Sequence, residues 1–114
     1  MSAITTHVLD TSLGRPAAGV PVVLEREEPR NSWSVVGRGV TDEDGRLRSL
    51  MPDDMSAGPG KYRLTFDTRS YHERTGASTF YPVVVIVFEA APGESHYHVP
   101  LLLSPFGYST YRGS

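Results

Sequence analysis

The segment Lys61-Tyr62-Arg63-Leu64-Thr65-Phe66 alternates polar and apolar side chains without interruption. Because successive side chains of a β-strand point to opposite faces, Tyr62, Leu64 and Phe66 are predicted to face a core. The polar side chains between them then face solvent, as in an antiparallel sheet that is covered on one side only. This segment therefore predicts a fold built from half-buried strands.

Short segments of similar length make up the rest of the chain. Nine prolines and eleven glycines divide the 114 residues into pieces of about eight residues, the spacing typical of strands in a sandwich or barrel. Residues 20–26 and 33–40 are further predicted strands. The sequence thus predicts a single all-β domain over residues 1–114, an antiparallel β-sandwich of about seven or eight strands.

Two segments depart from the alternating pattern. Residues 68–75 predict one short helix, with Asp67 or Thr68 as its N-cap and Gly76 as its C-terminal stop. Residues 83–88, Val-Val-Val-Ile-Val-Phe, are apolar on both faces. They predict either a central strand or a strand whose outer face meets another subunit.

Composition and charge limit the classes of partner that the sequence predicts. The net charge is −2, with 39% apolar and 21% charged residues and no cysteine. Without clustered Lys and Arg, neither nucleic acid nor an anionic membrane surface is an expected partner. The longest apolar run is far below the ~20 residues of a membrane-spanning helix, and the first residues do not resemble a signal peptide. We therefore expect a cytoplasmic protein without disulfides.

The segment His96-Tyr97-His98-Val99-Pro100-Leu101-Leu102-Leu103 carries the first candidate for chemistry. Alternation places His96 and His98 together on the face opposite Tyr97. Two imidazoles ~6.6 Å apart on one strand face could bind a metal or share acid–base work near neutral pH. They are also explained as two surface histidines. A zinc site needs a third ligand, which no Cys or HExxH pattern supplies, so no metal is predicted.

His7 and Arg46 are two further candidates. His7 shares a strand face with Thr5, and a lone strand histidine is either catalytic or simply structural or exposed. Arg46 follows the predicted turn Asp44-Gly45, where its guanidinium could hold a planar, oxygen-rich ligand through two hydrogen bonds. The alternative is a solvated arginine after a turn.

Residues 107–114, Gly-Tyr-Ser-Thr-Tyr-Arg-Gly-Ser, are polar, glycine-spaced and poorly suited to a core. Chain ends commonly fray, so this segment is either an exposed tail or a tethered part of a binding surface. In the second case Arg112, Ser114 and the terminal carboxylate would fold over a pocket. No GxSxG elbow, P-loop or GxGxxG fingerprint is present, which weighs against serine hydrolases and phosphate-binding enzymes.

Four segments together resemble the 5-hydroxyisourate hydrolases, also called transthyretin-related proteins. The resemblance spans the whole chain, and the terminal Tyr-Arg-Gly-Ser is its most specific part. It implies a transthyretin-like sandwich of two four-stranded antiparallel sheets with one short helix, assembled as a homotetramer that is a dimer of dimers. The segments are His7-Val8-Leu9-Asp10-Thr11, Thr41-Asp42-Glu43-Asp44-Gly45-Arg46, His96-Tyr97-His98-Val99-Pro100-Leu101-Leu102-Leu103-Ser104-Pro105 and Tyr108-Ser109-Thr110-Tyr111-Arg112-Gly113-Ser114.

The resemblance also implies an activity. It is the hydrolysis of 5-hydroxyisourate to 2-oxo-4-hydroxy-4-carboxy-5-ureidoimidazoline in urate and purine degradation, in a cleft between subunits and without metal or cofactor. The residues that match the family's catalytic set are His7, Arg46, His98 and Ser114. Those that match its substrate-binding set are Tyr111, Arg112 and Gly113.

Two other functional classes share the predicted fold. A hormone carrier such as transthyretin itself has other residues where this chain has His7, Arg46 and His98, and it lacks the Tyr-Arg-Gly-Ser ending. An immunoglobulin-like adhesion domain would explain the strands but not the polar tail. The sequence therefore favours the enzyme.

Overall fold

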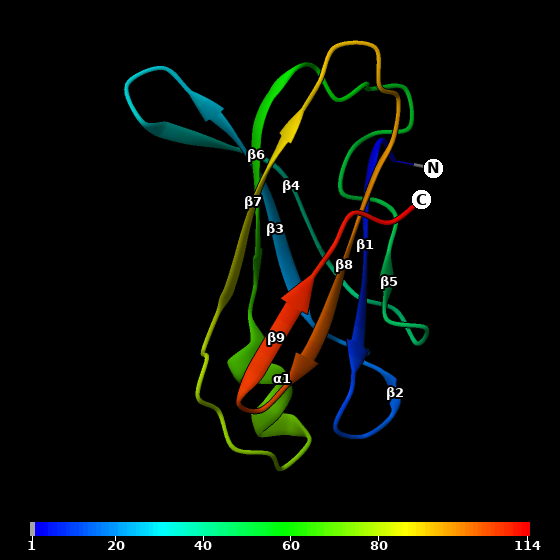
Figure 1. The fold of residues 1–114 in the computed structure, drawn as a ribbon, viewed down its shortest axis with the longest axis vertical. Helices are drawn as coiled ribbons and strands as arrows, with labels where there is room; N and C mark the ends of the chain where they lie inside the picture. The colour runs from blue at the N-terminus through cyan, green and yellow to red at the C-terminus, as the bar shows by residue number, and fades with distance from the viewer. Residues whose placement is uncertain (1) are drawn as a thin grey trace.

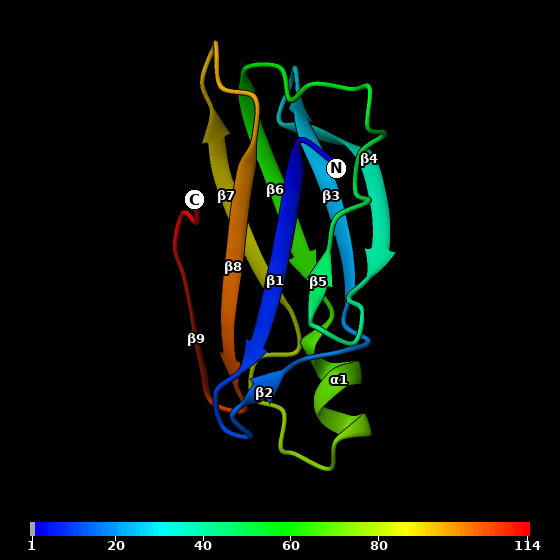
Figure 2. The same cartoon turned by 90° about the vertical axis from the view of Figure 1, so that its right-hand side faces the viewer.

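Two facing β-sheets form the computed structural model, which describes residues 2–114 (Figures 1 and 2). The first sheet contains β1 (Ile4–Asp10), β2 (Arg15–Pro16), β5 (Arg46–Leu47), β8 (Tyr97–Ser104) and β9 (Gly107–Thr110). The second contains β4 (Ser32–Val40), β3 (Pro21–Glu28), β6 (Gly60–Phe66) and β7 (Val84–Ala90), in that order across the sheet. The helix α1 (Thr68–Arg74) lies at one end of the sandwich (Figure 1). The predicted β-sandwich with one short helix is confirmed.

The first sheet has five strands but is never more than four strands wide. One edge of β1 pairs with β8 along its whole length. The other edge pairs with β5 at Thr6 and His7, and with β2 at Leu9 and Asp10. The two short strands thus occupy the same position in the sheet at different heights, consistent with the predicted four-strand width.

The predicted antiparallel pairing holds for every strand pair among residues 2–114 except β1–β8, which is parallel. Its register places Thr5 opposite His98. Parallel pairing needs a long connection between the strands, here most of the chain. The pairing brings β1, which carries His7, directly beside β8, which carries His98.

The core lies between the sheets and follows the alternating pattern. Tyr62, Leu64 and Phe66 of β6 are almost fully buried, as predicted. The inward side chains of the facing strand β8 include Leu101 and Leu103, which are also buried. Burial of each such side chain contributes about 1.5–3 kcal/mol, so alternation in these two strands fixes which faces meet.

Helix α1 confirms the predicted helix and its caps. The Asp67 carboxylate accepts the backbone N–H of Ser70 at 3.1 Å, which satisfies one free donor of the first turn. The helix ends one residue earlier than predicted, before Thr75, and Gly76 follows with a φ of +76°. This is the only helix among residues 2–114, and it is neither long nor apolar enough to cross a membrane.

The position of β7 excludes one of the two alternatives predicted for residues 83–88. The strand lies at the edge of its sheet, beside β6 only, so the central-strand alternative is wrong. Its outward side chains Val85 and Val87 are 44% and 54% exposed. An apolar outer face therefore remains uncovered in the single chain.

Strand β9 was not expected from the sequence. Residues 107–110 pair with β8 from Ser104 back to Leu101, so half of the polar tail is part of the first sheet. Main-chain hydrogen bonds, which do not depend on side-chain polarity, explain why composition missed it. Only the last four residues extend beyond the strand.

Candidate functional site

The candidate site lies on the outer face of the first sheet, where the candidate side chains of β1, β5 and β8 meet. His7 stands opposite Arg46 in the β1–β5 register, and Thr5 stands opposite His98 in the β1–β8 register. Residues two apart share a strand face, so both rows lie on the same side of the sheet. Tertiary structure thus brings together the three candidates that are far apart in the sequence.

A pocket of about 170 Å³ opens at this point. It contains the predicted residues Arg46, His98 and Ser114. Its other lining residues are Thr5, Thr6, Arg48 and His96. The pocket is walled by hydroxyls, imidazoles and guanidinium groups, which suits a small ligand that is rich in oxygen and nitrogen.

His98 is held from two sides. Its Nδ1 lies 2.8 Å from the hydroxyl of Thr5, which is buried and in turn lies 3.3 Å from Nε2 of His96. On the other side, the backbone N–H of Gly113 donates to the carbonyl oxygen of His98 at 2.8 Å. The backbone and one ring nitrogen are therefore fixed, which leaves Nε2 to act on a ligand.

The surroundings of His98 disfavour its cationic form. Burial lowers the pKa of the imidazole, and the neighbouring charges of His7, Arg46, His96 and Arg48 lower it further. The ordinary pKa of histidine is about 6.5. At neutral pH His98 is therefore a neutral imidazole, the form that accepts a proton.

His7 has a defined tautomer. Its Nε2 lies 2.8 Å from the carbonyl oxygen of Asp44, and a carbonyl can only accept, so Nε2 carries the hydrogen. When His7 is neutral, its free lone pair is therefore on Nδ1. His7 does not line the 170 Å³ pocket, although its charge acts on His98.

The turn before β5 determines where Arg46 lies. The side chain of Asp42 accepts two backbone N–H groups of its own turn, including that of Arg46 at 3.0 Å. This hydrogen bond from the Arg46 backbone is the main reason that the pKa of Asp42 is lowered. Gly45 has a φ of +74°, and a β-carbon there would lie 2.4 Å from the carbonyl oxygen of Val8. Glycine therefore lets the turn pack directly against β1.

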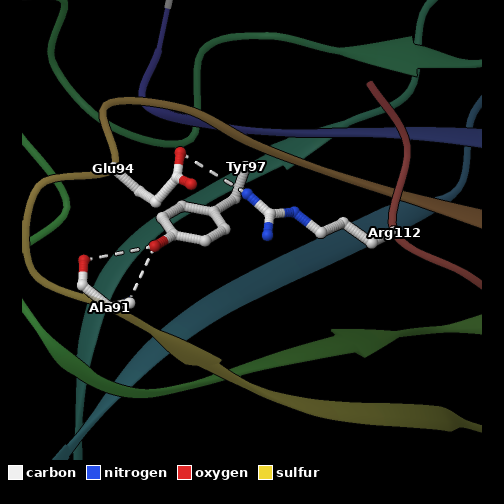
Figure 3. A network of polar contacts seen from close by, with 4 residues as sticks. All are labelled: Ala91, Glu94, Tyr97 and Arg112. Atoms are coloured by element: carbon white, nitrogen blue, oxygen red, sulfur yellow. Dashed lines mark hydrogen bonds and ion pairs between the residues drawn. The ribbon is translucent and has the colours of Figure 1, made fainter.

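The predicted substrate-binding residues Tyr111 and Arg112 lie in a different hollow. They line a second pocket of about 260 Å³, between the edges of the two sheets, to which His98 also contributes. The guanidinium of Arg112 stacks 5.0 Å from the centre of the Tyr97 ring and lies 3.6 Å from the Glu94 carboxylate (Figure 3). Arg112 thus anchors the tail to the loop before β8 in the single chain.

Tyr97 is itself tied down. Its hydroxyl accepts the backbone N–H of Ala91 at 2.7 Å and contacts the carbonyl oxygen of the same residue at 3.3 Å (Figure 3). The ring under Arg112 is therefore a fixed platform. The third predicted substrate-binding residue, Gly113, lines neither hollow but is in register with His98, which lines both.

Three of the pocket residues, Thr5, Thr6 and Arg48, were not predicted from the sequence, whereas His96 was already a candidate together with His98. The signal was partly present, because alternation put Thr5 with His7 and His96 with His98. Arg48 is two residues after Arg46 and so shares its side of the chain. Among residues 2–114, no group of three or more His, Asp or Glu side chains could hold a metal ion.

Comparison with known proteins places these features in a family. Residues 4–113 match the HIUase/Transthyretin family model. The chain is 47% identical over 111 residues to the 5-hydroxyisourate hydrolase of Salmonella dublin, covering 97% of this chain and 80% of that protein.

Solved structures agree with the family match. The 5-hydroxyisourate hydrolase of Klebsiella pneumoniae superimposes with a TM-score of 0.85 at 38% identity, over the whole of both chains. Sea bream transthyretin, solved in complex with thyroxine, superimposes with a TM-score of 0.90 at 34% identity, over 97% of this chain and 94% of that one. The predicted transthyretin-like fold is confirmed, and it is common to proteins with different functions.

Proposed function

The chain belongs to the HIUase/Transthyretin family and is a hydrolase of that family, and from this premise we propose that it hydrolyses 5-hydroxyisourate. One observation carries the proposal. His98, Arg46 and Ser114 line a single pocket, with His98 neutral at physiological pH and fixed on both sides. The proposed product is 2-oxo-4-hydroxy-4-carboxy-5-ureidoimidazoline, which places the enzyme in urate degradation.

The proposed reaction needs one base and one acid. Water loses a proton and adds to the carbonyl carbon of a ring amide, the amide C–N bond breaks, and the leaving nitrogen takes up a proton. A carboxylic acid and a ureido group result, so that one water is consumed and the ring is opened. We assign the two proton transfers to His7 and His98.

Arg46 is suited to stabilising the negative charge that develops on the substrate. Addition of water to the carbonyl creates a negative oxygen, and a preorganised cation beside that oxygen lowers the barrier. Arg46 is half-buried and lines the pocket, and the Asp42 turn holds its backbone N–H, so its side chain starts from a fixed point of the main chain. Ser114, which also lines the pocket, would orient the water or an imidazole.

We further propose that the site is completed between subunits of a homotetramer, a dimer of dimers. The pocket of about 170 Å³ is smaller than the ~300–1,000 Å³ usual for ligand sites, which supports a second wall from another subunit. Apolar side chains available for subunit contacts include Val85 and Val87 on β7. Of the Leu101-Leu102-Leu103 run only Leu102 remains for this role, because its neighbours are in the core.

The proposal is tested by following the ultraviolet absorbance of 5-hydroxyisourate freshly generated from urate. Decay that accelerates in proportion to added protein is expected, and the His98→Asn variant serves as the matched control for nonspecific effects. Decay at the spontaneous rate in the presence of folded protein would contradict the hydrolase. It would favour a carrier, the function suggested by the equally similar fold of thyroxine-bound sea bream transthyretin.

The assembly is tested separately by sedimentation velocity at micromolar concentration. A tetramer is expected. A monomer under these conditions would contradict a site shared between subunits.

A further inference from the structure

A buried hydroxyl lies between two imidazoles of the site. Oγ1 of Thr5 is 2.8 Å from Nδ1 of His98 and 3.3 Å from Nε2 of His96. Thr5 is only 3% exposed, and among residues 2–114 its hydroxyl forms no other hydrogen bond. Since a buried polar group must be paired, the hydroxyl of Thr5 donates its one hydrogen to one of these two histidines and accepts a hydrogen from the other.

Two arrangements of hydrogens are possible with neutral imidazoles. In the first, Thr5 donates to Nδ1 of His98 and accepts from Nε2 of His96, so the hydrogen of His98 is on Nε2. In the second, Nδ1 of His98 donates to Thr5, and Thr5 donates to Nε2 of His96. Only the second leaves a lone pair on Nε2 of His98.

The protonated form of His98 decides between them. An imidazolium carries a hydrogen on both nitrogens, so Thr5 must then accept from Nδ1 and turn its own hydrogen to His96. In the second arrangement this network is already in place before Nε2 of His98 takes up a proton. In the first, Nε2 already carries a hydrogen, so it can accept a proton from the pocket only after that hydrogen has moved to Nδ1 and the buried hydroxyl has rotated.

The charges around the pocket point the same way. Guanidinium groups have only donors, so a lone pair on the pocket side of His98 faces Arg46 and Arg48 more favourably than an N–H would. No protein group among residues 2–114 forms a hydrogen bond with that nitrogen. The titratable and charged groups around His98 are His7, His96, Arg46 and Arg48 and, across the second pocket, Glu89, Tyr97, Tyr111 and Arg112.

We infer that Thr5 is a positioning residue that accepts the Nδ1 hydrogen of His98 and passes its own hydrogen to His96. It thereby keeps Nε2 of His98 free to take a proton from water. The inference rests on the proposed hydrolase function and deepens it, because it makes His98 the base and gives His96 a defined role as the acceptor for Thr5.

The tautomer is measured without substrate, so the result does not depend on the hydrolase proposal. In the whole protein labelled with ¹⁵N-histidine, long-range ¹H–¹⁵N spectra above pH 7 distinguish protonated from unprotonated ring nitrogens. For His98 we expect a protonated Nδ1 and an unprotonated Nε2. A protonated Nε2 with an unprotonated Nδ1 would overturn the inference, whatever the activity of the enzyme.

Two variants of Thr5 link the tautomer to catalysis. Thr5→Val removes the hydroxyl with little change of shape and is expected to lower kcat on the order of 10-fold, with KM nearly unchanged. Thr5→Ser retains the hydroxyl and is expected to restore most of kcat. Loss of the acceptor at Nδ1 also destabilises the imidazolium, so the acid limb of the kcat profile should move to lower pH in Thr5→Val. Wild-type kcat and an unmoved acid limb in folded Thr5→Val would overturn the inference.

His96→Phe gives an independent test that leaves Thr5 intact. Without an acceptor at position 96, the Thr5 hydroxyl should turn and donate to Nδ1 of His98, which shifts the hydrogen of His98 to Nε2. The spectrum should then show the reversed tautomer, and kcat should fall by about as much as in Thr5→Val. An unchanged His98 tautomer in His96→Phe would contradict the relay through Thr5.

Discussion

A β-carbon on Gly113 would lie 2.6 Å from Cδ2 of His98, while the Gly113 N–H donates to the His98 carbonyl oxygen at 2.8 Å. The tail therefore lies directly against the imidazole, at a distance that no other residue type permits. This contact explains in physical terms why a glycine precedes the final serine. It also makes the position of His98 sensitive to a single methyl group.

Gly113→Ala should therefore displace either the imidazole or the tail. Because a misplacement of about 1 Å can cost about 10²-fold in rate, we expect kcat/KM to fall by about 10- to 100-fold. Gly107→Ala is the matched control, since its β-carbon would meet nothing closer than Ser104 Oγ at 3.7 Å. Equal activity of the two variants in the absorbance assay would argue against a tight tail–imidazole contact.

His98→Asn and Arg46→Glu should each remove most of the activity. Loss of an acid–base group costs about 10²–10⁴-fold, and Glu at position 46 replaces the stabilising cation with an anion. Sedimentation should show the same assembly as the unmodified protein. Arg38→Glu, an exposed arginine on β4 of the other sheet, is the control with the same change of charge and should keep its activity. Near-normal turnover by His98→Asn and Arg46→Glu would refute the assignment of these residues.

The pH dependence follows from the lowered pKa of His98. Its causes, burial first and then the charges of His7, Arg46, His96 and Arg48, keep the base neutral below the ordinary pKa of about 6.5. The acid limb of kcat/KM should therefore fall below pH 6.5. Arg48→Gln removes one of these positive charges, so the limb should move to higher pH, which a pH–rate profile measures directly.

The same shift makes the fold less stable in acid. Below about pH 6.5 the unfolded chain binds more protons at His98 than the folded chain does, so this group lowers the free energy of unfolding as pH falls. Above about pH 6.5, His98 does not lower the free energy of unfolding. The free energy of unfolding is measured in urea at two pH values, one above and one below about 6.5. Its decrease in acid should persist in Thr5→Ser and become smaller in His98→Asn.

Tyr71→Phe tests a contact away from the site. The Tyr71 hydroxyl donates to Asp10 at 2.6 Å and connects α1 to the end of β1. Burial and the Asp10 carboxylate raise the pKa of Tyr71 to about 12. Removing a hydrogen bond to a charged group should cost about 1.5–3 kcal/mol of unfolding free energy, measured in urea at pH 7.

The difference in unfolding free energy between the wild-type protein and Tyr71→Phe should also depend on pH in alkali. A raised pKa in the folded state means that the stabilisation is complete below the ordinary tyrosine pKa of about 10 and is lost as pH rises toward 12. The wild-type protein should therefore lose its advantage over Tyr71→Phe between these values. A constant difference across that range would show that the hydroxyl is not responsible.

Val85→Lys tests whether the apolar face of β7 contacts a second subunit. Val85 is already 44% exposed in the single chain, so the folded subunit should tolerate a lysine. Burying its charge in a subunit contact would be costly, and sedimentation velocity should show smaller species. Val35→Lys, 48% exposed on the opposite edge strand β4, is the control and should leave the assembly unchanged. An intact tetramer with lysine at Val85 would exclude this face as the contact.

Local patterns predicted much of the fold. Alternation in residues 61–66 and 96–103 identified the buried faces of β6 and β8, and the capping residues located α1 to within one residue. These features depend on neighbours in the chain, which the sequence displays. Strand β9 depends on pairing with β8 instead, and its polar composition gave no sign of it.

The sequence by itself determined which residue types were available for chemistry: two histidines on one strand face, a third histidine on another, an arginine after a turn, and a polar tail. The tertiary structure decided their arrangement. Parallel pairing of β1 with β8 placed Thr5 against His98, and the β1–β5 pair placed Arg46 opposite His7. Strand register across sequence separations of up to about ninety residues is set by packing of the two sheets as a whole. No local pattern of amino acids encodes it.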